Sequence, residues 1–391
     1  MPKYNAIFNL ALILLTPLHT QTEKPLYLPG LNGIRAIAAL AVVVSHTTLS
    51  LPDDFHLKGA FFGVNDTGGA KGYMLAAFGV TIFFALSGFL ITYLLLLESD
   101  KQEIDVKKFY VRRILRIWPL YYCYLLLSVI TLLLFGIAFE WKTILLMTFF
   151  AANIPAILNL ATPLLYHFWS IGVEEQFYLF WPWIIKKIKH NLVLWLIVFI
   201  VLQNAARFFL WHYYPFSKAA ELSLENRFDG MMIGAVGAIL YKQKNALFLK
   251  WVDNRWMQYL VFFILALITL NKFGINASVV DNFVVSCITV ALIVGQINRK
   301  NRWINLDKPV LDFLGKISYG IYVYHPLVIF FFSKMYHFPA GNPLYAYILV
   351  FASVITGTIL IACISYQYFE RRFIKWKRSL EVIKSSGTRE A

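Results

Sequence analysis

The chain consists mainly of long apolar runs that are separated by short polar or basic stretches. A transmembrane helix needs about 20 predominantly apolar residues, and ten runs meet or approach that length. They lie at residues 31–51, 73–97, 118–138, 168–185, 191–211, 228–241, 256–273, 281–297, 317–333 and 344–369. This pattern predicts an all-α fold, a polytopic membrane helix bundle of about ten transmembrane helices.

Two further apolar stretches do not fit this count. Residues 143–160 are apolar enough to cross a membrane, but Asn153 and Pro155 interrupt them. We expect a re-entrant or interfacial segment there, with a true span as the alternative. Residues 6–18 have the length of a signal-peptide core but lack a cleavage site after it. We expect residues 1–24 to be a short apolar or interfacial segment, with a cleaved signal as the alternative.

Composition and charge support a membrane protein. Apolar residues make up 59% of the sequence, the mean hydropathy is +0.62, and charged residues make up 15%, against about 25% in a soluble domain. The net charge of +15 does not indicate nucleic-acid binding, because the Lys and Arg residues form short clusters between apolar runs. These clusters lie at residues 101–116, 186–189, 242–255, 299–316 and 371–378.

The basic clusters also predict a topology. All of them can lie in the cytoplasm if both termini do. Residues 25–370 would then form one integral membrane domain, and residues 371–391 a basic cytoplasmic tail. The cysteines, Cys123, Cys287 and Cys363, each lie within an apolar run and have no metal-ligand spacing. We therefore expect neither a disulfide framework nor a metal site.

Arg35 and His46 are the most informative residues of the first long run. They are eleven positions apart, which places them on one helix face, about 16 Å apart along its axis. A chargeable side chain within a membrane span costs a few kcal/mol and is by default a functional-site hypothesis. Arg113 and Arg116 share a helix face just before a later run, where two guanidinium groups could bind one phosphate. Positive-inside topology and lipid headgroup contact are the alternative for these two arginines.

A second polar constellation lies in residues 166–182. His167, Ser170 and Glu174 are spaced to form one stripe of a helix, and Trp169 fits an aromatic belt. A carboxylate inside the membrane needs a partner or a water-lined cavity and could act as an acid or base. The alternative is an anchor at the membrane interface.

Three more residues are candidates for supporting roles. Arg227 and Asp229 precede a short Gly-rich run, where we expect an ion pair that holds a helix end. His325 lies within a run and precedes Pro326. Taken alone, it is more typical of a packing histidine than of a catalyst.

Six motifs follow one another along the chain. They are YLPGLNGIRAIAALAVVVSH (27–46), FGVTIFFALSGFLITY (78–93), FYVRRILRIWPLY (109–121), WSIGVEEQFYLFWP (169–182), RFDGMMIGAVGA (227–238) and ISYGIYVYHPL (317–327). Together they resemble the membrane acyltransferase-3 family. The resemblance covers about residues 25–370 and implies a bundle of about ten transmembrane helices. It also implies transfer of acyl groups, commonly acetyl from acetyl-CoA, to hydroxyls of cell-envelope or secreted carbohydrates.

The resemblance assigns roles residue by residue. The family's Arg and His of the first span map to Arg35 and His46, its R-x-x-R element to Arg113 and Arg116, and its W-S-x-x-x-E glutamate to Glu174. The usual Asp of the D-G-L-R opening is replaced by Asn32, so the charge beside the first arginine is missing from this position.

These assignments predict an O-acyltransferase. His46 would be the base or nucleophile, and Glu174 would be a second catalytic residue that tunes His46 if the two helices meet. Arg35, Arg113 and Arg116 would bind the acyl-CoA donor. No metal is expected. The acceptor would be a carbohydrate, and the family's usual setting is the bacterial inner membrane. The alternative is a glycolipid or polysaccharide transporter, which would also use charged residues within the membrane.

Overall fold

The computed structural model describes residues 25–57, 72, 74–158, 160, 163–188, 190–215, 217–270, 272, 280–338 and 344–384. The regular elements in these ranges are helices. The predicted N-terminal segment, residues 1–24, lies outside the described residues.

Each of the ten predicted runs contains a helix. Six helices are long and apolar enough to cross a membrane in the described part of the chain: α2, α3, α4, α8, α13, and α16 together with its continuation to Ser379. The all-helical fold is therefore confirmed, whereas the count of about ten spans stays a prediction. The helices that match the runs are α2 (Leu31–Asp53), α3 (Met74–Lys101), α4 (Val106–Leu134), α7 (Phe168–Lys187), α8 (Leu192–Tyr213), α10 (Phe228–Lys242), α12 (Arg255–Thr269), α13 (Val280–Asn298), α15 (Ser318–Met335) and α16 (Leu344–Ser365).

Shorter helices connect or extend these elements. Residues 143–160, predicted to be re-entrant or interfacial, form parts of two short helices around Phe150, whose φ of 58° interrupts the helix. A continuous helical span is therefore absent from this segment, and its depth in the membrane stays a prediction. The shorter elements are α5 (Trp141–Thr148), α6 (Asn153–Ile157), α9 (Lys218–Glu225), α11 (Ala246–Val252), α14 (Pro309–Lys316), a π-helical turn (Tyr366–Glu370) and α17 (Arg371–Ser379).

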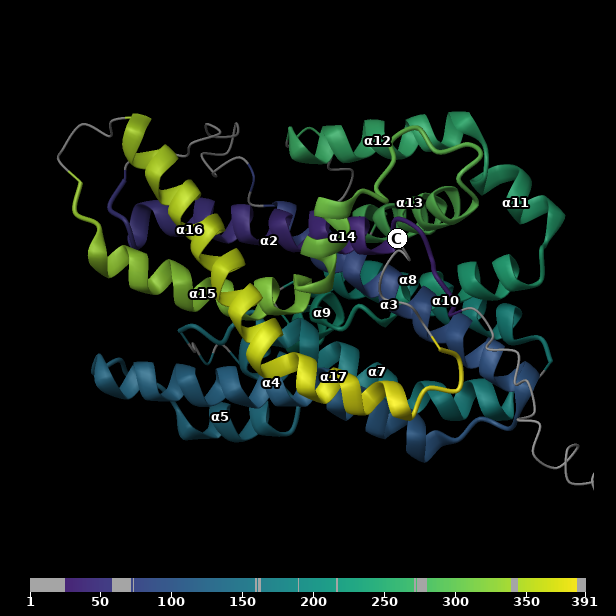
Figure 1. Cartoon of the computed structure of the whole chain (residues 1–391), viewed down its shortest axis with the longest axis horizontal. Helices are drawn as coiled ribbons and strands as arrows, with labels where there is room; N and C mark the ends of the chain where they lie inside the picture. The colour runs from purple at the N-terminus through teal and green to yellow at the C-terminus, as the bar shows by residue number, and fades with distance from the viewer. Residues whose placement is uncertain are drawn as a thin grey trace, which may run out of the picture.

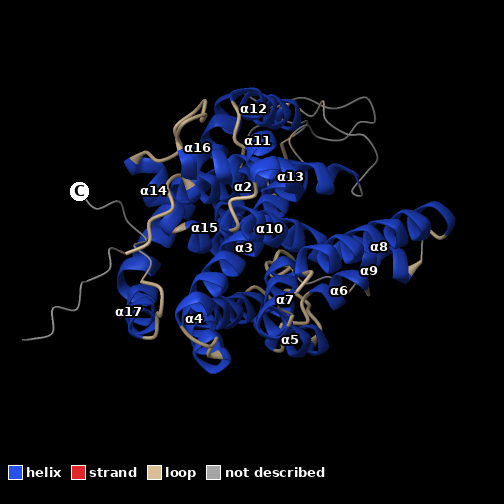
Figure 2. Cartoon of the chain, turned by 90° about the vertical axis from the view of Figure 1, so that its right-hand side faces the viewer, coloured by secondary structure: helices blue, strands red, loops and turns tan. Residues whose placement is uncertain are grey.

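Helix α3 packs at the centre of the bundle, between α2, α10 and α13 (Figure 2). Glycines allow α3 and α10 to approach closely: a Cβ at Gly88 would lie 1.9 Å from the carbonyl oxygen of Met231. A Cβ at Gly234 would lie 2.0 Å from the carbonyl oxygen of Ala85. Such close backbone packing is typical of helix pairs in membranes.

The five basic clusters lie toward one end of the bundle, which we call the basic end, between the centre and the right-hand side of Figure 1. Direct contacts join them, because residues in or beside one cluster bind residues of another. These contacts are Lys186 to Glu103 at 2.9 Å, Lys242 to Asp100 at 2.7 Å, Asn301 to the Asp253 carbonyl at 2.6 Å, and Arg112 to the Leu380 carbonyl at 3.1 Å. A one-sided distribution of Lys and Arg is what the positive-inside rule requires.

The first and last described segments meet at this end. The backbone N–H of Leu26 donates a hydrogen bond to the carbonyl oxygen of Lys384 at 2.7 Å. Both segments therefore lie on the same side of the bundle. In a membrane, the chain between them would cross an even number of times.

Candidate active site

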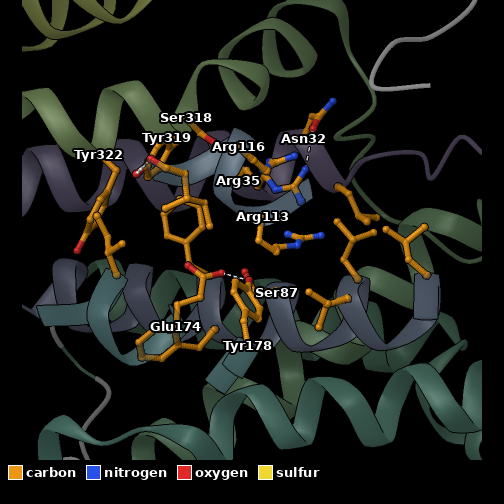
Figure 3. A pocket seen from close by; sticks show the side chains of 18 of the residues that line it. Asn32, Arg35, Ser87, Arg113, Arg116, Glu174, Tyr178, Ser318, Tyr319 and Tyr322 are labelled. Atoms are coloured by element: carbon orange, nitrogen blue, oxygen red, sulfur yellow. Dashed lines mark hydrogen bonds between the residues drawn. The ribbon is translucent and has the colours of Figure 1, made fainter. Parts of the chain in front are cut away.

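A cavity of about 200 Å³ opens among α2, α3, α4, α7, α15 and α17. We call it the arginine cavity, because the guanidinium groups of Arg35, Arg113 and Arg116 gather on one side of it (Figure 3). Glu174 lies across from them, and Lys377 of α17 also lines the cavity. The sequence-predicted phosphate ligands thus meet in one place.

Hydrogen bonds satisfy the arginines only in part. Arg35 Nη1 donates to Asn32 Oδ1 at 3.1 Å. The Arg113 guanidinium carbon lies 5.3 Å from the centre of the Tyr178 ring, and Arg113 Nε is buried with no hydrogen-bond partner among the described residues. The Arg116 side chain is exposed to the cavity. A buried donor without a partner is costly, so the cavity is suited to an anionic ligand with several oxygen acceptors.

Charge balance points the same way. Four cationic side chains line the cavity, and Glu174 is the one carboxylate among the described lining residues. Glu174 accepts a hydrogen bond from the Tyr178 hydroxyl. Glu381 pairs with Lys377 at 2.8 Å. The cations therefore exceed the nearby carboxylates, which favours a ligand with more than one negative charge.

Ser170 and Tyr322 form the wall of the cavity that is next to the histidines. Their hydroxyl oxygens are 2.5 Å apart, and the Tyr322 hydroxyl also donates to the carbonyl oxygen of His167 at 2.9 Å. The Tyr322 ring lies 5.9 Å from the ring of His325, centre to centre. Tyr322 therefore touches both the cavity and the residues behind it.

Three histidines lie behind this wall, and we call His46, His167 and His325 the histidine group. His46 Nδ1 is 2.7 Å from His325 Nε2, and the rings of His167 and His325 are 5.2 Å apart. None of the three is among the described residues that line the arginine cavity. His46 Nε2 lies 3.2 Å from the hydroxyl of Tyr166, whose side chain is 56% exposed. His46 Nε2 therefore points toward a partly exposed residue that is not among the described lining of the cavity.

The two predicted catalytic residues do not contact each other as expected. Glu174 lines the arginine cavity, whereas the hydrogen bonds of His46 go to Tyr166 and His325. His325, expected as a packing residue, is fully buried and is the direct partner of His46. Of the predicted polar stripe, Ser170 and Glu174 reach the cavity. No group of three His, Cys, Asp or Glu side chains in the described ranges is arranged to hold a metal ion.

The remaining candidates lie at the start of α10. The Arg227 guanidinium lies over the ring of Trp169, at 5.2 Å from its centre, and donates to the carbonyl oxygen of Ala77. Asp229 forms the buried ion pair that was expected at this helix end, but its partner at 3.0 Å is Arg207 of α8. Arg207 is not among the residues predicted from the sequence, although an arginine within an apolar run is itself a signal.

Two further residues were missed. Lys377 was assigned to a cytoplasmic tail, yet α17 packs against α4 and brings this lysine to the cavity. Asp312 accepts a hydrogen bond from Asn32 Nδ2 at 2.8 Å. The two residues are 280 positions apart, so no local pattern indicates the contact.

Fold and site together define a helical membrane protein with a cavity lined by four cationic side chains at its basic end and a histidine group behind one wall of that cavity. The chain belongs to the acyltransferase-3 family, since the family model described as an acyltransferase domain matches residues 28–366.

Curated relatives agree with this membership. One, of Staphylococcus aureus strain COL, is named as a putative O-acetyltransferase and is 30% identical over 383 residues, covering 91% of this chain and 59% of the relative. Another, O-acetyltransferase OatA of Staphylococcus aureus strain NCTC 8325, is 26% identical over 376 residues, covering 89% of this chain and 57% of the relative. The chain thus spans less than two thirds of the length of these relatives. No solved structure matches it.

Proposed function

We propose that this chain is a membrane O-acyltransferase that takes an acetyl group from acetyl-CoA and transfers it to a hydroxyl of a carbohydrate. Arg35, Arg113 and Arg116 bind the phosphates of the coenzyme in the arginine cavity. His46 acts on the acceptor hydroxyl. The relatives' names support O-acetyl transfer, and the cavity's cations support a polyphosphate donor.

One observation carries the proposal. Three guanidinium groups from two different helices converge on a cavity whose wall, Tyr322, packs against the partner of His46. The basic end is assigned to the cytoplasm by the positive-inside rule, and acetyl-CoA is a cytoplasmic metabolite. The donor then enters from the cytoplasm, and the acceptor reaches His46 from the other side.

The reaction follows from these positions. His46 takes the proton of the acceptor hydroxyl while its oxygen attacks the thioester carbon. The new C–O bond forms and the C–S bond breaks. The departing thiolate takes up the proton that His46 holds, so coenzyme A leaves and His46 is neutral again. The hydroxyl of Ser170 lines the cavity and can donate to the thioester oxygen as negative charge develops on it, once Tyr322 has moved aside.

Tyr322 must move for this transfer, because its side chain separates the cavity from the histidine group. Its hydroxyl would leave Ser170 when the thioester advances. Glu174 takes a role within the cavity in this scheme, through its hydrogen bond from Tyr178. It orients the donor, while the partner of His46 is His325.

The test uses purified full-length protein in lipid nanodiscs with radiolabelled acetyl-CoA and a panel of saccharides. We expect acetylated saccharide with the wild type, at least a hundredfold less with His46→Ala, and a raised KM for acetyl-CoA with Arg116→Gln. Arg255→Gln changes an exposed arginine outside the cavity and serves as the matched control. Equal turnover by wild type and His46→Ala contradicts the proposal. Movement of glycan across proteoliposomes without acetylation would show a transporter instead.

A further inference from the structure

We propose that His325 is a positioning residue that fixes the tautomer of His46, so that His46 Nε2 is the basic nitrogen. The same geometry assigns the position of the Tyr166 hydroxyl as the binding position of the acceptor hydroxyl. The inference rests on the proposed function for its effect on the reaction, but the tautomer can be measured independently of activity.

The first step is the protonation of His325. Its Nδ1 lies 2.7 Å from the carbonyl oxygen of Tyr322. A carbonyl oxygen can only accept a hydrogen bond, so Nδ1 of His325 carries the proton. In a neutral imidazole the other nitrogen then has the lone pair, and Nε2 of His325 is an acceptor.

The second step passes this constraint to His46. Because His325 Nε2 accepts, the atom 2.7 Å from it, His46 Nδ1, must donate. His46 therefore carries its proton on Nδ1 and its lone pair on Nε2. A doubly protonated His325 would instead donate from Nε2 to His46 Nδ1. However, the His325 side chain is 0% exposed, and its hydrogen-bond partners are a carbonyl and another imidazole. A buried charge without a carboxylate partner is strongly unfavourable.

The third step concerns access to the basic nitrogen. The Tyr166 hydroxyl lies 3.2 Å from His46 Nε2 and can donate to its lone pair. An acceptor hydroxyl needs the same hydrogen bond in order to lose its proton to His46. Since the Tyr166 side chain is 56% exposed, a saccharide can replace its hydroxyl from outside without opening the bundle.

His167 shows the contrast within the same group. Its Nε2 lies 3.2 Å from the carbonyl oxygen of Val323, so this nitrogen carries the proton. Its Nδ1 is buried with no partner in the described part of the chain. His167 therefore packs against His325 but has no hydrogen bond through which to orient His46.

The kinetic test compares two substitutions at one position. In His325→Gln the side-chain oxygen can still accept from His46 Nδ1, whereas His325→Phe keeps a ring without an acceptor. We expect kcat for acetyl transfer to fall about a hundredfold in His325→Phe and about tenfold or less in His325→Gln. The KM for acetyl-CoA should change less than about twofold in both. His212→Gln, at an exposed histidine of α8, is the matched control.

Equal losses in the two variants, or a loss that appears only in the KM for acetyl-CoA, would overturn the positioning role. If the variants fail to fold, solid-state NMR of the ¹⁵N-histidine-labelled wild type decides the tautomer, with His46→Gln used to assign the signals. A protonated Nδ1 and an unprotonated Nε2 in His46 support the inference, and the reverse pattern contradicts it. If the protein has this tautomer but does not transfer acetyl groups, only the proposed function is contradicted.

Discussion

Asn32 donates its side-chain amide to Asp312 at 2.8 Å, and its oxygen accepts from Arg35 at 3.1 Å. Position 32 is where the resemblance to the family leads one to expect an aspartate. The structure instead places the carboxylate of Asp312, on α14, next to the Asn32 amide, which lies between it and Arg35. Asp312 also pairs with Lys316 at 2.6 Å. The negative charge lost from α2 is therefore present near Arg35, supplied by a different helix.

Exchanging these two residues tests the relationship. Asn32→Asp alone puts two carboxylates in hydrogen-bond contact, so we expect a loss of about 1–3 kcal/mol in stability and a raised KM for acetyl-CoA. Combining it with Asp312→Asn restores one donor and one acceptor. The double variant should recover most of the loss, as measured by thermal unfolding and by donor kinetics. If the loss in the double variant equals the sum of the losses in Asn32→Asp and Asp312→Asn, the contact has no such role.

Lys377 provides a test of the cavity's fourth cation. A charge-assisted hydrogen bond to phosphate is worth about 1.5–3 kcal/mol, so Lys377→Gln should raise the KM for acetyl-CoA about tenfold. The matched control is Lys375→Gln, which removes the same charge from an exposed position of α17. If both substitutions have the same effect, general electrostatic attraction explains it and the specific contact does not.

Tyr322 is expected to keep water away from the bound thioester. Tyr322→Phe retains the ring but removes the hydrogen bonds to Ser170 and to the His167 carbonyl. These hydrogen bonds stabilise the closed position of the side chain by about 1 kcal/mol. Their loss should increase acetyl-CoA hydrolysis in the absence of acceptor about fivefold. Release of free coenzyme A, followed with a thiol reagent, measures this rate. An unchanged rate would mean that the two hydroxyls do not restrict access.

The Arg207–Asp229 pair should be structural. Both side chains are buried, at 1% and 2% exposure, so Arg207→Met leaves an unpaired buried carboxylate and should cost about 3–5 kcal/mol. Replacing both residues, with Arg207→Met and Asp229→Leu, should recover much of this stability. Thermal unfolding in detergent gives the comparison, and the donor KM of the double variant should match the wild type. If the donor KM of the double variant rises while its thermal stability matches that of the wild type, the pair belongs to the binding site.

Sequence reasoning was most successful where spacing along one helix decides the outcome. Arg113 and Arg116 share a face because they are three residues apart, and both line the cavity. Periodicity places Arg35 and His46 on one stripe, but it does not show that Tyr322 separates their surroundings. That separation depends on how α15 packs beside α7, which the sequence of either helix alone does not determine.

The missed residues have a common physical cause. Asp312 and Lys377 act through contacts between elements that are far apart in the chain, and each lies in a segment whose own composition indicates only a basic, polar loop or tail. His325 is a candidate for a supporting role in the sequence, but its contact with His46 is not predictable there, since a buried histidine gives the same sequence signal whether it packs or positions another residue.

The backbone hydrogen bond between Leu26 and Lys384 has a practical consequence for engineering. Because residues 26 and 384 are adjacent, a circular permutant that joins these two positions through a short linker is feasible, with new ends opened in a loop elsewhere. Because Leu26 lines the arginine cavity, an affinity tag attached directly at this position would crowd the cavity. Tags should instead be spaced from the bundle by a long, flexible linker.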